Sequence, residues 1–490
     1  MGFDRIALYF HNLYYGIGNL KAEKSPDAIQ LGVLGAASFS PGGLSDAART
    51  HSDVVITAIG ARVLEKAQAQ AKEYGIPRAH GSYQEVIELD DVDAACIPLP
   101  IAYHAEWAIK AARAGKHVLV EKPICSIAVS ASGRMFSNYP LGLDATNTKY
   151  QVAELKPNNT ETPYPDAEIN TPPGGPIDYS TYPASSKGDP DHFVAVQSVV
   201  VDAADRLWVL DTGRVSLEND TLLTSQYGGP KLVGISLSNN TVFKTILFPP
   251  NVAYGDSYPN DVRFDLRPSV SGSGQGIAYI TDSSSEGRNG IIVVDLGSGE
   301  SWRQLENIPQ VRPEAGFFAQ VWGEPVYMND GIRPITPLAF GADGITLSND
   351  GETLYFSVVS GRYLFSVPTA RLRDRGPSSA LFAAGSVMNL GQKGVSDGLE
   401  SDSNGIVYAG SVETNSINIF SPENGTISTY LRNPKIDWTD TFSVAGDYIY
   451  FTENQLWRKP SSQGGVDRRV KPYALYRVPL LNNATKISLL

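Results

Sequence analysis

Aspartates recur directly before short apolar segments in the C-terminal two-thirds of the chain. Asp261, Asp343, Asp397 and Asp440 each hold such a position, and Asn260 precedes the first of them. If these segments lie side by side, the carboxylates meet around one axis, where like charges raise one another's pKa unless a cation shares the site. Oxygen ligands suit Ca²⁺, for which we predict Asn260, Asp261, Asp343 and Asp397, and the five residues together also suit a protonated amine. The alternative is that each aspartate only caps a turn through its own backbone.

The segments that follow these aspartates belong to a repeated unit. An apolar strand, a polar turn and a second apolar strand recur, as in "SVVVDAADRLWVLDTGR", "DGITLSNDGETLYFSVVSG" and "DTFSVAGDYIYFTEN". Repeated antiparallel sheets at wide intervals favour a β-propeller, whose radial closure protects the strand edges. Five copies are legible, and a sixth has to come from less regular segments. In a propeller the starts of the innermost strands converge at one mouth of the central channel, which is where the aspartates stand.

The first quarter of the chain has a different pattern and different chemistry. Apolar strands alternate with helical segments between residues 26 and 123, which predicts a Rossmann-type parallel sheet with right-handed crossovers. The first strand runs into "GAASFS", in which only Gly35 of the expected glycines remains and Ala37 narrows the approach of a pyrophosphate. Arg62 follows the second strand, where an arginine favours the 2′-phosphate of NADP over NAD.

This first quarter resembles the N-terminal domain of the Gfo/Idh/MocA oxidoreductases. The resemblance covers residues 28–124 and rests on "GVLGAASFS" and "IPLPIAYHAEWAIKAARAGKHVLVEKP". It implies that Lys122 lies near nicotinamide and substrate, with His104 beside the cofactor. The cofactor-binding set that it implies is Gly35, Ala37, Ser38, Phe39, Arg62, Pro100, Glu121 and Lys122. The second domain of those enzymes, which supplies the proton donor, does not follow, so we expect a nucleotide-binding remnant without activity.

The remainder of the chain resembles the major royal jelly and yellow proteins. The resemblance runs from about residue 145 to 485 and rests on "VQSVVVDAADRLWVLDTGR", "SYPNDVRFD" and "AYITDSSSEGRNGIIVVDL". It implies a secreted six-bladed propeller, with relatives that bind biogenic amines or are linked to dopachrome conversion. Insect members commonly carry disulfides, whereas both cysteines here, Cys96 and Cys125, precede this half.

Composition excludes several classes of partner. The net charge is −12, and residues 136–490 hold 27 basic and 38 acidic side chains, a net of −11. An acidic body repels phosphate backbones, so we expect no nucleic-acid partner. No apolar run is long enough to span a membrane. No histidine follows His192, which excludes imidazole chemistry from most of the second half.

Glycosylation acceptors point to an extracellular second half. Five N-x-[ST] triplets occur, all after residue 136, and the first residues of the chain make a poor signal peptide. The acceptors are Asn158, Asn219, Asn239, Asn424 and Asn483.

These observations predict a mixed fold: an incomplete α/β Rossmann-type domain fused to an all-β six-bladed propeller. The predicted boundaries are an extension over 1–27, the Rossmann-type domain over 28–124, a junction over 125–145 and the propeller over 146–490. The predicted function is binding of a small cationic ligand, a biogenic amine or Ca²⁺, at the central channel. Two alternatives are an NADP-dependent oxidoreductase and an interaction scaffold without a small ligand.

Overall fold

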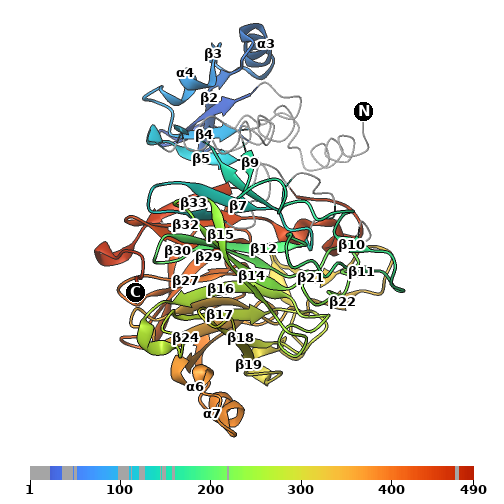
Figure 1. Ribbon diagram of the computed structural model, residues 1–490. Helices are drawn as coiled ribbons and strands as arrows, with labels where there is room; N and C mark the ends of the chain where they lie inside the picture. Colours follow the sequence, from blue (N-terminus) through green and yellow to red (C-terminus); the bar gives the residue numbers. More distant parts are fainter. Residues whose placement is uncertain are drawn as a thin grey trace. The chain divides into compact units, whose positions relative to one another are not determined.

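Figure 1 shows the computed structural model of the chain, which describes residues 23–35, 48, 52–97, 107, 110–111, 113–120, 127–143, 145, 150–156, 161–217, 220–469 and 474–490. The chain divides into two compact units. The first contains the elements between residues 29 and 120, and the second contains nearly all elements after residue 123. Each unit has its own buried core, so each is described by itself.

The first unit is built on a parallel sheet. Its five strands lie in the order β3-β2-β1-β4-β5, and every adjacent pair is parallel. The apolar strand centres predicted from the sequence form the core, where Val33, Leu34 and Ile59 are buried. The prediction of a parallel sheet of the Rossmann type is therefore confirmed. The elements are β1 (Ile29–Leu34), β2 (Val54–Gly60), α3 (Leu64–Tyr74), β3 (Arg78–His80), α4 (Tyr83–Ile87), β4 (Ala94–Ile97) and β5 (His117–Val120).

Five four-stranded sheets and the neighbouring strands β31, β32 and β33 form the body of the second unit in the described part of the chain. They are β6–β9, β12–β15, β16–β19, β23–β26, β27–β30 and β31–β33. The first strand of each sheet contacts the first strands of two other sheets, and the contacts run β6, β12, β16, β23, β27, β31 and back to β6. A closed ring of this kind is the arrangement of a β-propeller, which leaves no long strand edge unprotected.

The strands of these sheets are short, and the described pairings between successive strands are antiparallel. Their bounds are β6 (Ile127–Val129), β7 (Met135–Asn138), β8 (Val152–Leu155), β9 (Glu161–Pro163), β12 (Val196–Val201), β13 (Arg206–Asp211), β14 (Lys231–Ser236), β15 (Thr241–Leu247), β16 (Pro259–Asp265), β17 (Ile277–Asp282), β18 (Gly290–Asp295), β19 (Ser301–Gln304), β23 (Ala342–Leu347), β24 (Thr353–Val358), β25 (Tyr363–Pro368), β26 (Met388–Gln392), β27 (Leu399–Ser401), β28 (Val407–Ser411), β29 (Ser416–Ser421), β30 (Thr426–Arg432), β31 (Thr439–Ala445), β32 (Tyr448–Glu453) and β33 (Ala474–Pro479).

Smaller elements connect the sheets. No helix in the described part of the chain is long and apolar enough to cross a membrane. The connecting strands are β10 (Ile177–Asp178), β11 (Ser185–Ser186), β20 (Ala319–Val321), β21 (Glu324–Met328) and β22 (Thr336–Pro337). The helices are η3 (Pro268–Val270), η4 (Pro309–Val311), α6 (Thr369–Arg373), α7 (Ser379–Gly385), η5 (Leu456–Arg458), η6 (Pro460–Ser462) and η7 (Leu481–Asn483).

The repeated sequence unit folds as a clamped hairpin. Between β12 and β13, Asp202 accepts hydrogen bonds from two backbone N–H groups of the turn, and the indole N–H of Trp208 donates to it at 2.8 Å. Between β27 and β28, Asp402 accepts the same backbone bonds, and the Tyr408 hydroxyl donates to it at 2.9 Å. The recurring pattern of an aspartate six residues before an aromatic residue therefore closes the turn that joins the first two strands of a sheet.

The region predicted as a junction contributes to the propeller ring. Strands β6 and β7 lie within residues 125–145 and pair with each other and with β8. Phe136, at the centre of β7, is fully buried in the core that this sheet shares with β12 and β13. The sheet that the repeat pattern left unassigned is therefore made by residues 127–163, whose strands are too short to show a clear alternation.

The last residues of the chain tie three sheets together. Leu489 accepts a hydrogen bond from the backbone N–H of Leu266 at 2.9 Å, and Thr485 accepts one from Ser403 at 2.9 Å. The Lys486 ammonium donates to the carbonyl of Val201 at 3.2 Å.

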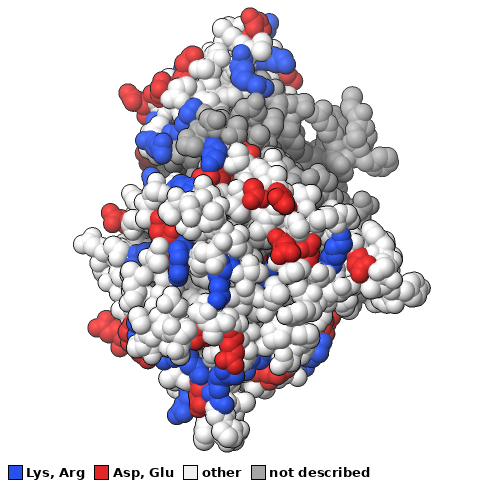
Figure 2. Space-filling view, viewed as in Figure 1, with Lys and Arg blue, Asp and Glu red and all other residues white. Residues whose placement is uncertain are grey.

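On the face that Figure 2 presents, acidic and basic side chains are interspersed, with no extended stripe of one sign.

Candidate functional site

A local irregularity at the start of the first strands turns polar side chains toward the centre of the ring. The pairing register shifts between Val196 and Ser198 in β12, and at the corresponding place in β16, β23 and β31. An extra residue in one strand of a pair leaves its side chain out of the regular alternation. The residues inside the irregularities include Gln197, Asn260, Asp261, Asp343 and Asp440.

A cavity of about 670 Å³ opens above these residues. Its floor is polar and combines side chains from five sheets: Gln197, Asn260, Asp343, Asp397 and Asp440. Its walls are largely apolar and aromatic and include Val326, Leu338, Phe340, Trp438, Leu456 and Trp457. We call this space the wide cavity. The sequence prediction that aspartates from separate repeats share one site therefore describes the floor of a real cavity.

Each of the three aspartates on the floor is held by a neutral N–H donor. The donors come from an asparagine, a tryptophan and a second asparagine, and in each case one carboxylate oxygen accepts the bond. The pairs are Asn260 Nδ2 to Asp343 Oδ2 at 2.5 Å, Trp438 Nε1 to Asp397 Oδ2 at 2.8 Å, and Asn454 Nδ2 to Asp440 Oδ2 at 2.6 Å. The donors fix the orientation of the carboxylates without balancing their charge.

The electrostatics of the floor reflect this charge, which the ammonium groups of Lys393 and Lys459 offset in part at Asp397. Burial, followed by the charges of neighbouring carboxylates, raises the pKa of Asp343 and of Asp440 well above the ordinary value. Burial also raises the pKa of Asp397 to about 6, although the Trp438 indole and the Lys393 ammonium oppose the rise. Asp343 and Asp397 are only 6% and 7% exposed. The floor therefore gains free energy from any cation that approaches it.

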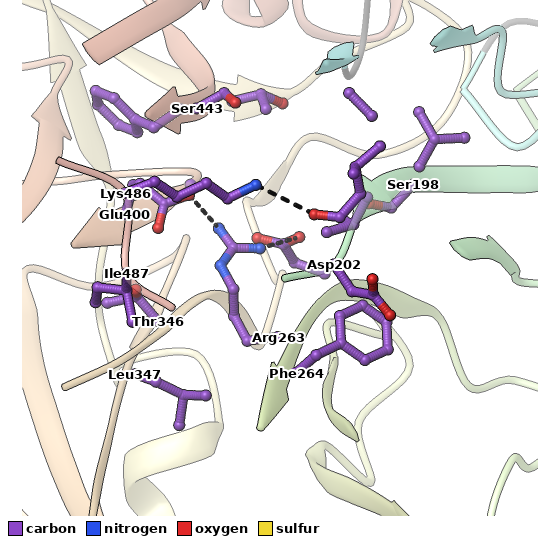
Figure 3. A pocket seen from close by; sticks show the side chains of 18 of the residues that line it. Ser198, Asp202, Arg263, Phe264, Thr346, Leu347, Glu400, Ser443, Lys486 and Ile487 are labelled. Atoms are coloured by element: carbon purple, nitrogen blue, oxygen red, sulfur yellow. Dashed lines mark hydrogen bonds and ion pairs between the residues drawn. The ribbon is translucent and has the colours of Figure 1, made fainter. Parts of the chain in front are cut away.

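Asp261 lies on the other side of the floor. It lines a second, narrow cavity of about 140 Å³, which shares Gln197, Asn260, Asp343 and Asp440 with the wide cavity. There its Oδ1 pairs with Arg263 Nη1 at 2.9 Å. Figure 3 shows Arg263 within the narrow cavity, with Glu400 beside its guanidinium. Arg263 also donates to the carbonyl of Leu399 at 2.7 Å. The charge of Asp261 is thus balanced within the protein.

The turn-capping alternative describes Asp261 in part. Its Oδ1 accepts the backbone N–H of Val262 at 3.0 Å, as a capping aspartate does. The bonds to Asp343, Asp397 and Asp440 come from side chains instead. The sequence could not separate these cases, because the same residue type occupies the same place in each repeat.

The floor does not fit Ca²⁺ as it stands. Within the described ranges, no three His, Cys, Asp or Glu side chains lie close enough together to hold a metal ion. Ca²⁺ needs six to eight oxygens at about 2.3–2.6 Å. On the floor, one oxygen of each carboxylate already accepts an N–H group.

Two floor partners were not predicted from the sequence as site residues. Asn454 and Ser283 each bind a floor residue and stand directly after the second strand of their sheet. Each follows a buried acidic residue, Glu453 and Asp282 respectively. Ser283 accepts the second N–H of Asn260 at 2.9 Å. A polar residue directly after "YITD" or "YFTE" is the signal that could have found them.

In the first unit, the structure describes two of the predicted cofactor residues. Gly35 ends β1 with a φ of 135°, and its N–H donates to the carbonyl of Gly60 at 2.8 Å. Arg62 is exposed two residues after β2 ends. Both stand at the carboxyl ends of neighbouring strands, where dinucleotides bind in such sheets. Ala37, Ser38, Phe39, Pro100, His104, Glu121 and Lys122 lie outside the described residues.

Family models match both parts of the chain. The model described as "Major royal jelly protein" matches residues 194–485, and that of the oxidoreductase family with an NAD-binding Rossmann fold (Gfo/Idh/MocA) matches residues 29–136. Major royal jelly protein 1 of Apis mellifera is 25% identical over 243 residues, covering 48% of this chain and 51% of that protein. D-xylose 1-dehydrogenase (NADP(+)) 2 of Haloferax volcanii is 40% identical over 100 residues, covering 20% of this chain and 30% of that protein.

Among solved structures, regucalcin of Agrobacterium tumefaciens, a calcium-binding protein, is similar at 12% identity with a TM-score of 0.41. The similarity covers 76% of this chain and 94% of that one. The chain spans only about 30% of the length of the oxidoreductases that it matches and about half of the length of the royal jelly proteins.

Proposed function

Because the chain belongs to the major royal jelly protein family, we propose that its second unit is a six-bladed propeller that binds a small protonated amine on the floor of the wide cavity. The closed ring of six first strands supports the number of blades. The proposed ligand is supported chiefly by the three floor aspartates that neutral donors hold, of which Asp343 and Asp397 are buried and Asp440 is half-buried. A cation supplies the charge that the protein leaves out.

An ammonium group suits this floor better than a metal ion does. A primary ammonium carries its charge on N–H donors, so one floor carboxylate is enough to bind it, whereas Ca²⁺ needs about six to eight oxygens. Charge-assisted hydrogen bonds of this kind are roughly twice as strong as neutral ones. The apolar walls, with Phe340, Trp438 and Trp457, suit the carbon body of an amine and stack on an aromatic ring if it has one.

Titration with tyramine tests the proposal. Trp438 and Trp457 line the cavity, so their fluorescence should change and saturate as the amine binds. The Asp397→Asn variant keeps an acceptor for the Trp438 indole but removes the charge, and we expect its Kd to rise by at least about tenfold.

Asp220→Asn is the matched control for this titration, because Asp220 lines the same cavity from an exposed loop and its loss should leave Kd within about twofold. No saturable change in the wild type up to millimolar tyramine would overturn the proposal. Competition between Ca²⁺ and tyramine, with a Ca²⁺ effect lost in Asp397→Asn, would favour the metal instead.

A second candidate function belongs to the first unit. Gly35 and Arg62 end adjacent strands of the Rossmann-type sheet, and a relative over this region is named as an NADP(+) enzyme. These observations support NADP binding by the first unit, with oxidoreductase activity as the alternative to an inactive remnant. NADPH fluorescence in the full chain should rise saturably, and Arg62→Ala should weaken NADPH more than NADH. Equal binding of NADPH and NADH by the wild-type protein would contradict the proposed preference of Arg62 for NADPH.

We further infer that the second unit works outside the cell. Three of the predicted glycosylation acceptors, Asn239, Asn424 and Asn483, lie on exposed turns. Such turns leave room for a glycan on the folded surface. Expression in a secreting eukaryotic host should add glycans that a glycosidase removes, with a matching loss of mass.

A further inference from the structure

The connection between β25 and β26 exposes large apolar side chains on a projecting segment. Helices α6 and α7 form this connection and extend away from the strands of their sheet, as Figure 1 shows. In α7, Leu381 is 73% exposed and Phe382 is 53% exposed, and Met388 at the start of β26 is 61% exposed. Single exposed apolar residues are ordinary, whereas a group of them within one short segment marks a site of interaction. We call residues 369–388 the helical tip.

The helical tip is held firmly to the protein. Leu372 and Ala383 are fully buried in the core that the sheets β16–β19 and β23–β26 share. From β19, the Trp302 indole donates to the carbonyl of Leu372 at 2.9 Å, and the Gln304 amide donates to that of Asp374 at 2.8 Å. The base of the tip is therefore fixed between two sheets, and the exposure of its apolar side chains is built into the fold.

The charge of the helical tip is opposite to that of the chain. Residues 369–388 contain three arginines and one aspartate, a net of +2, in a chain with a net of −12. Arg373 donates to the buried Tyr279 hydroxyl at 3.0 Å, and Arg375 pairs with Glu300 at 2.6 Å. Arg371 is exposed, and its guanidinium lies 5.7 Å from the ring centroid of Phe382. The tip thus presents a cation directly beside its apolar side chains.

This combination suits the surface of an anionic lipid bilayer. Apolar side chains enter the boundary between headgroups and acyl chains, while an adjacent arginine meets the lipid phosphates. In Figure 2 the end of the molecule that α7 forms is largely white, with basic side chains gathered next to it. The negative charge of the rest of the chain has little effect there, because salt screens charges beyond about 8 Å.

The size of the helical tip favours a bilayer over a protein partner. Helices α6 and α7 have five and seven residues. A stable protein–protein interface takes about 20–30 residues from each side and is usually shaped to match its partner. A projecting tip needs no matching surface in a bilayer, because lipids rearrange around the side chains that enter.

We propose that the helical tip docks the second unit onto an anionic lipid surface. Leu381 and Phe382 enter the interface, and Arg371 binds a lipid phosphate. The inference is independent of the amine site, because the tip and the wide cavity have no lining residue in common.

Sedimentation of the full chain with lipid vesicles tests this proposal. Wild-type protein should sediment with vesicles of phosphatidylcholine mixed with phosphatidylserine, and less of it should do so as the salt concentration rises. Leu381→Ser/Phe382→Ser should lower the partition constant by at least about tenfold. Arg371→Gln should lower it by about fivefold on these vesicles and have little effect on pure phosphatidylcholine.

Ile332→Ser/Ile335→Ser is the matched control, because both isoleucines are exposed on a different connection, between β21 and β22, and it should bind as wild type does. All variants should unfold near the wild-type temperature, since the replaced side chains are exposed. Failure of the wild type to bind the mixed vesicles, or equal binding by Leu381→Ser/Phe382→Ser, would overturn the proposal. Dimerisation of the wild type that this variant abolishes, without vesicle binding, would assign the tip to a second copy of the chain instead.

Discussion

Buried carboxylates in the second unit differ in what balances their charge. Asp211 pairs with Lys231 at 3.0 Å and Asp282 pairs with Arg303 at 2.9 Å, and all four side chains are buried. Glu453 holds the equivalent place at the end of β32, but two backbone N–H groups and one hydroxyl bind it instead. Burial raises the pKa of Glu453 to about 8. The same structural position thus forms an ion pair in two sheets, whereas in the third only neutral donors bind the carboxyl.

Glu453→Gln should stabilise the protein at high pH and not at low pH. The folded state keeps a proton on Glu453 up to about pH 8, whereas the unfolded chain loses it near the ordinary value of 4.5. Between these values the folded state binds more protons, so the free energy of unfolding falls as pH rises. Glutamine removes this dependence, and we expect a gain on the order of a few kcal/mol at pH 8 and almost none at pH 4.5.

Denaturant unfolding at the two pH values measures this difference. Asp282→Asn is a useful contrast, because it removes the buried charge that pairs with Arg303 and leaves only Glu306 at 3.9 Å, so it should destabilise the protein at both pH values. A constant gap between wild type and Glu453→Gln across the range would show that Glu453 is ionised in the fold.

At the scale of elements, the first strands carry both the ring and the site. Their regular parts pair with the second strands and bury apolar residues such as Val262 and Ile345. At their irregular starts, side chains depart from the regular alternation and line the cavities. Apolar alternation predicts the regular part of a strand, whereas an irregularity depends on which residue the partner strand presents opposite it. The aspartates could therefore be found from the sequence, but their orientation could not.

The contribution of the C-terminal segment to the free energy of unfolding can be measured by substituting two adjacent leucines. Leu489 is 6% exposed and packs in the core shared by the sheets of β16–β19 and β23–β26, whereas Leu490 is 63% exposed. Leu489→Ala should lower the free energy of unfolding by roughly 2–4 kcal/mol, because it leaves a cavity between two sheets. Leu490→Ala should change it by less than about 0.5 kcal/mol. Equal, small effects in both variants would mean that the segment does not hold the sheets together.

At the scale of the whole molecule, amine binding should be coupled to protons. The pKa of Asp397 is raised to about 6, and an ammonium binds the ionised carboxylate. Affinity should therefore be high above pH 6 and fall as pH decreases through that value, approaching tenfold per unit below it. Calorimetry at pH 6 in two buffers of different ionisation enthalpy should show release of protons on binding.

Asp397→Asn identifies the group responsible for that release. The variant should bind more weakly, and the part of the pH dependence centred near pH 6 should disappear. Asp220→Asn should keep the wild-type profile. An unchanged profile in Asp397→Asn would assign the coupled proton to another residue.

The sequence by itself determined the two fold classes and the division of the chain. Alternating strands and helices require a parallel sheet, and repeated short strands joined by turns require antiparallel sheets that pack on one another. In each case the pattern of apolar residues leaves one way to bury the apolar faces. The sequence also predicted one site shared by Asn260, Asp261, Asp343, Asp397 and Asp440, of which the structure places all but Asp261 in the lining of the wide cavity. These conclusions depend on local spacing, which the chain carries wherever it folds.

The tertiary structure alone decided which aspartate is balanced and which is not. Arg263 neutralises Asp261, while Asn260, Trp438 and Asn454 orient the others from residues far away in the sequence or on other strands. The ring also decided that residues 127–163 supply a sheet. Such pairings arise only when the ring closes, because closure sets which side chains meet across neighbouring sheets and which are left for a ligand.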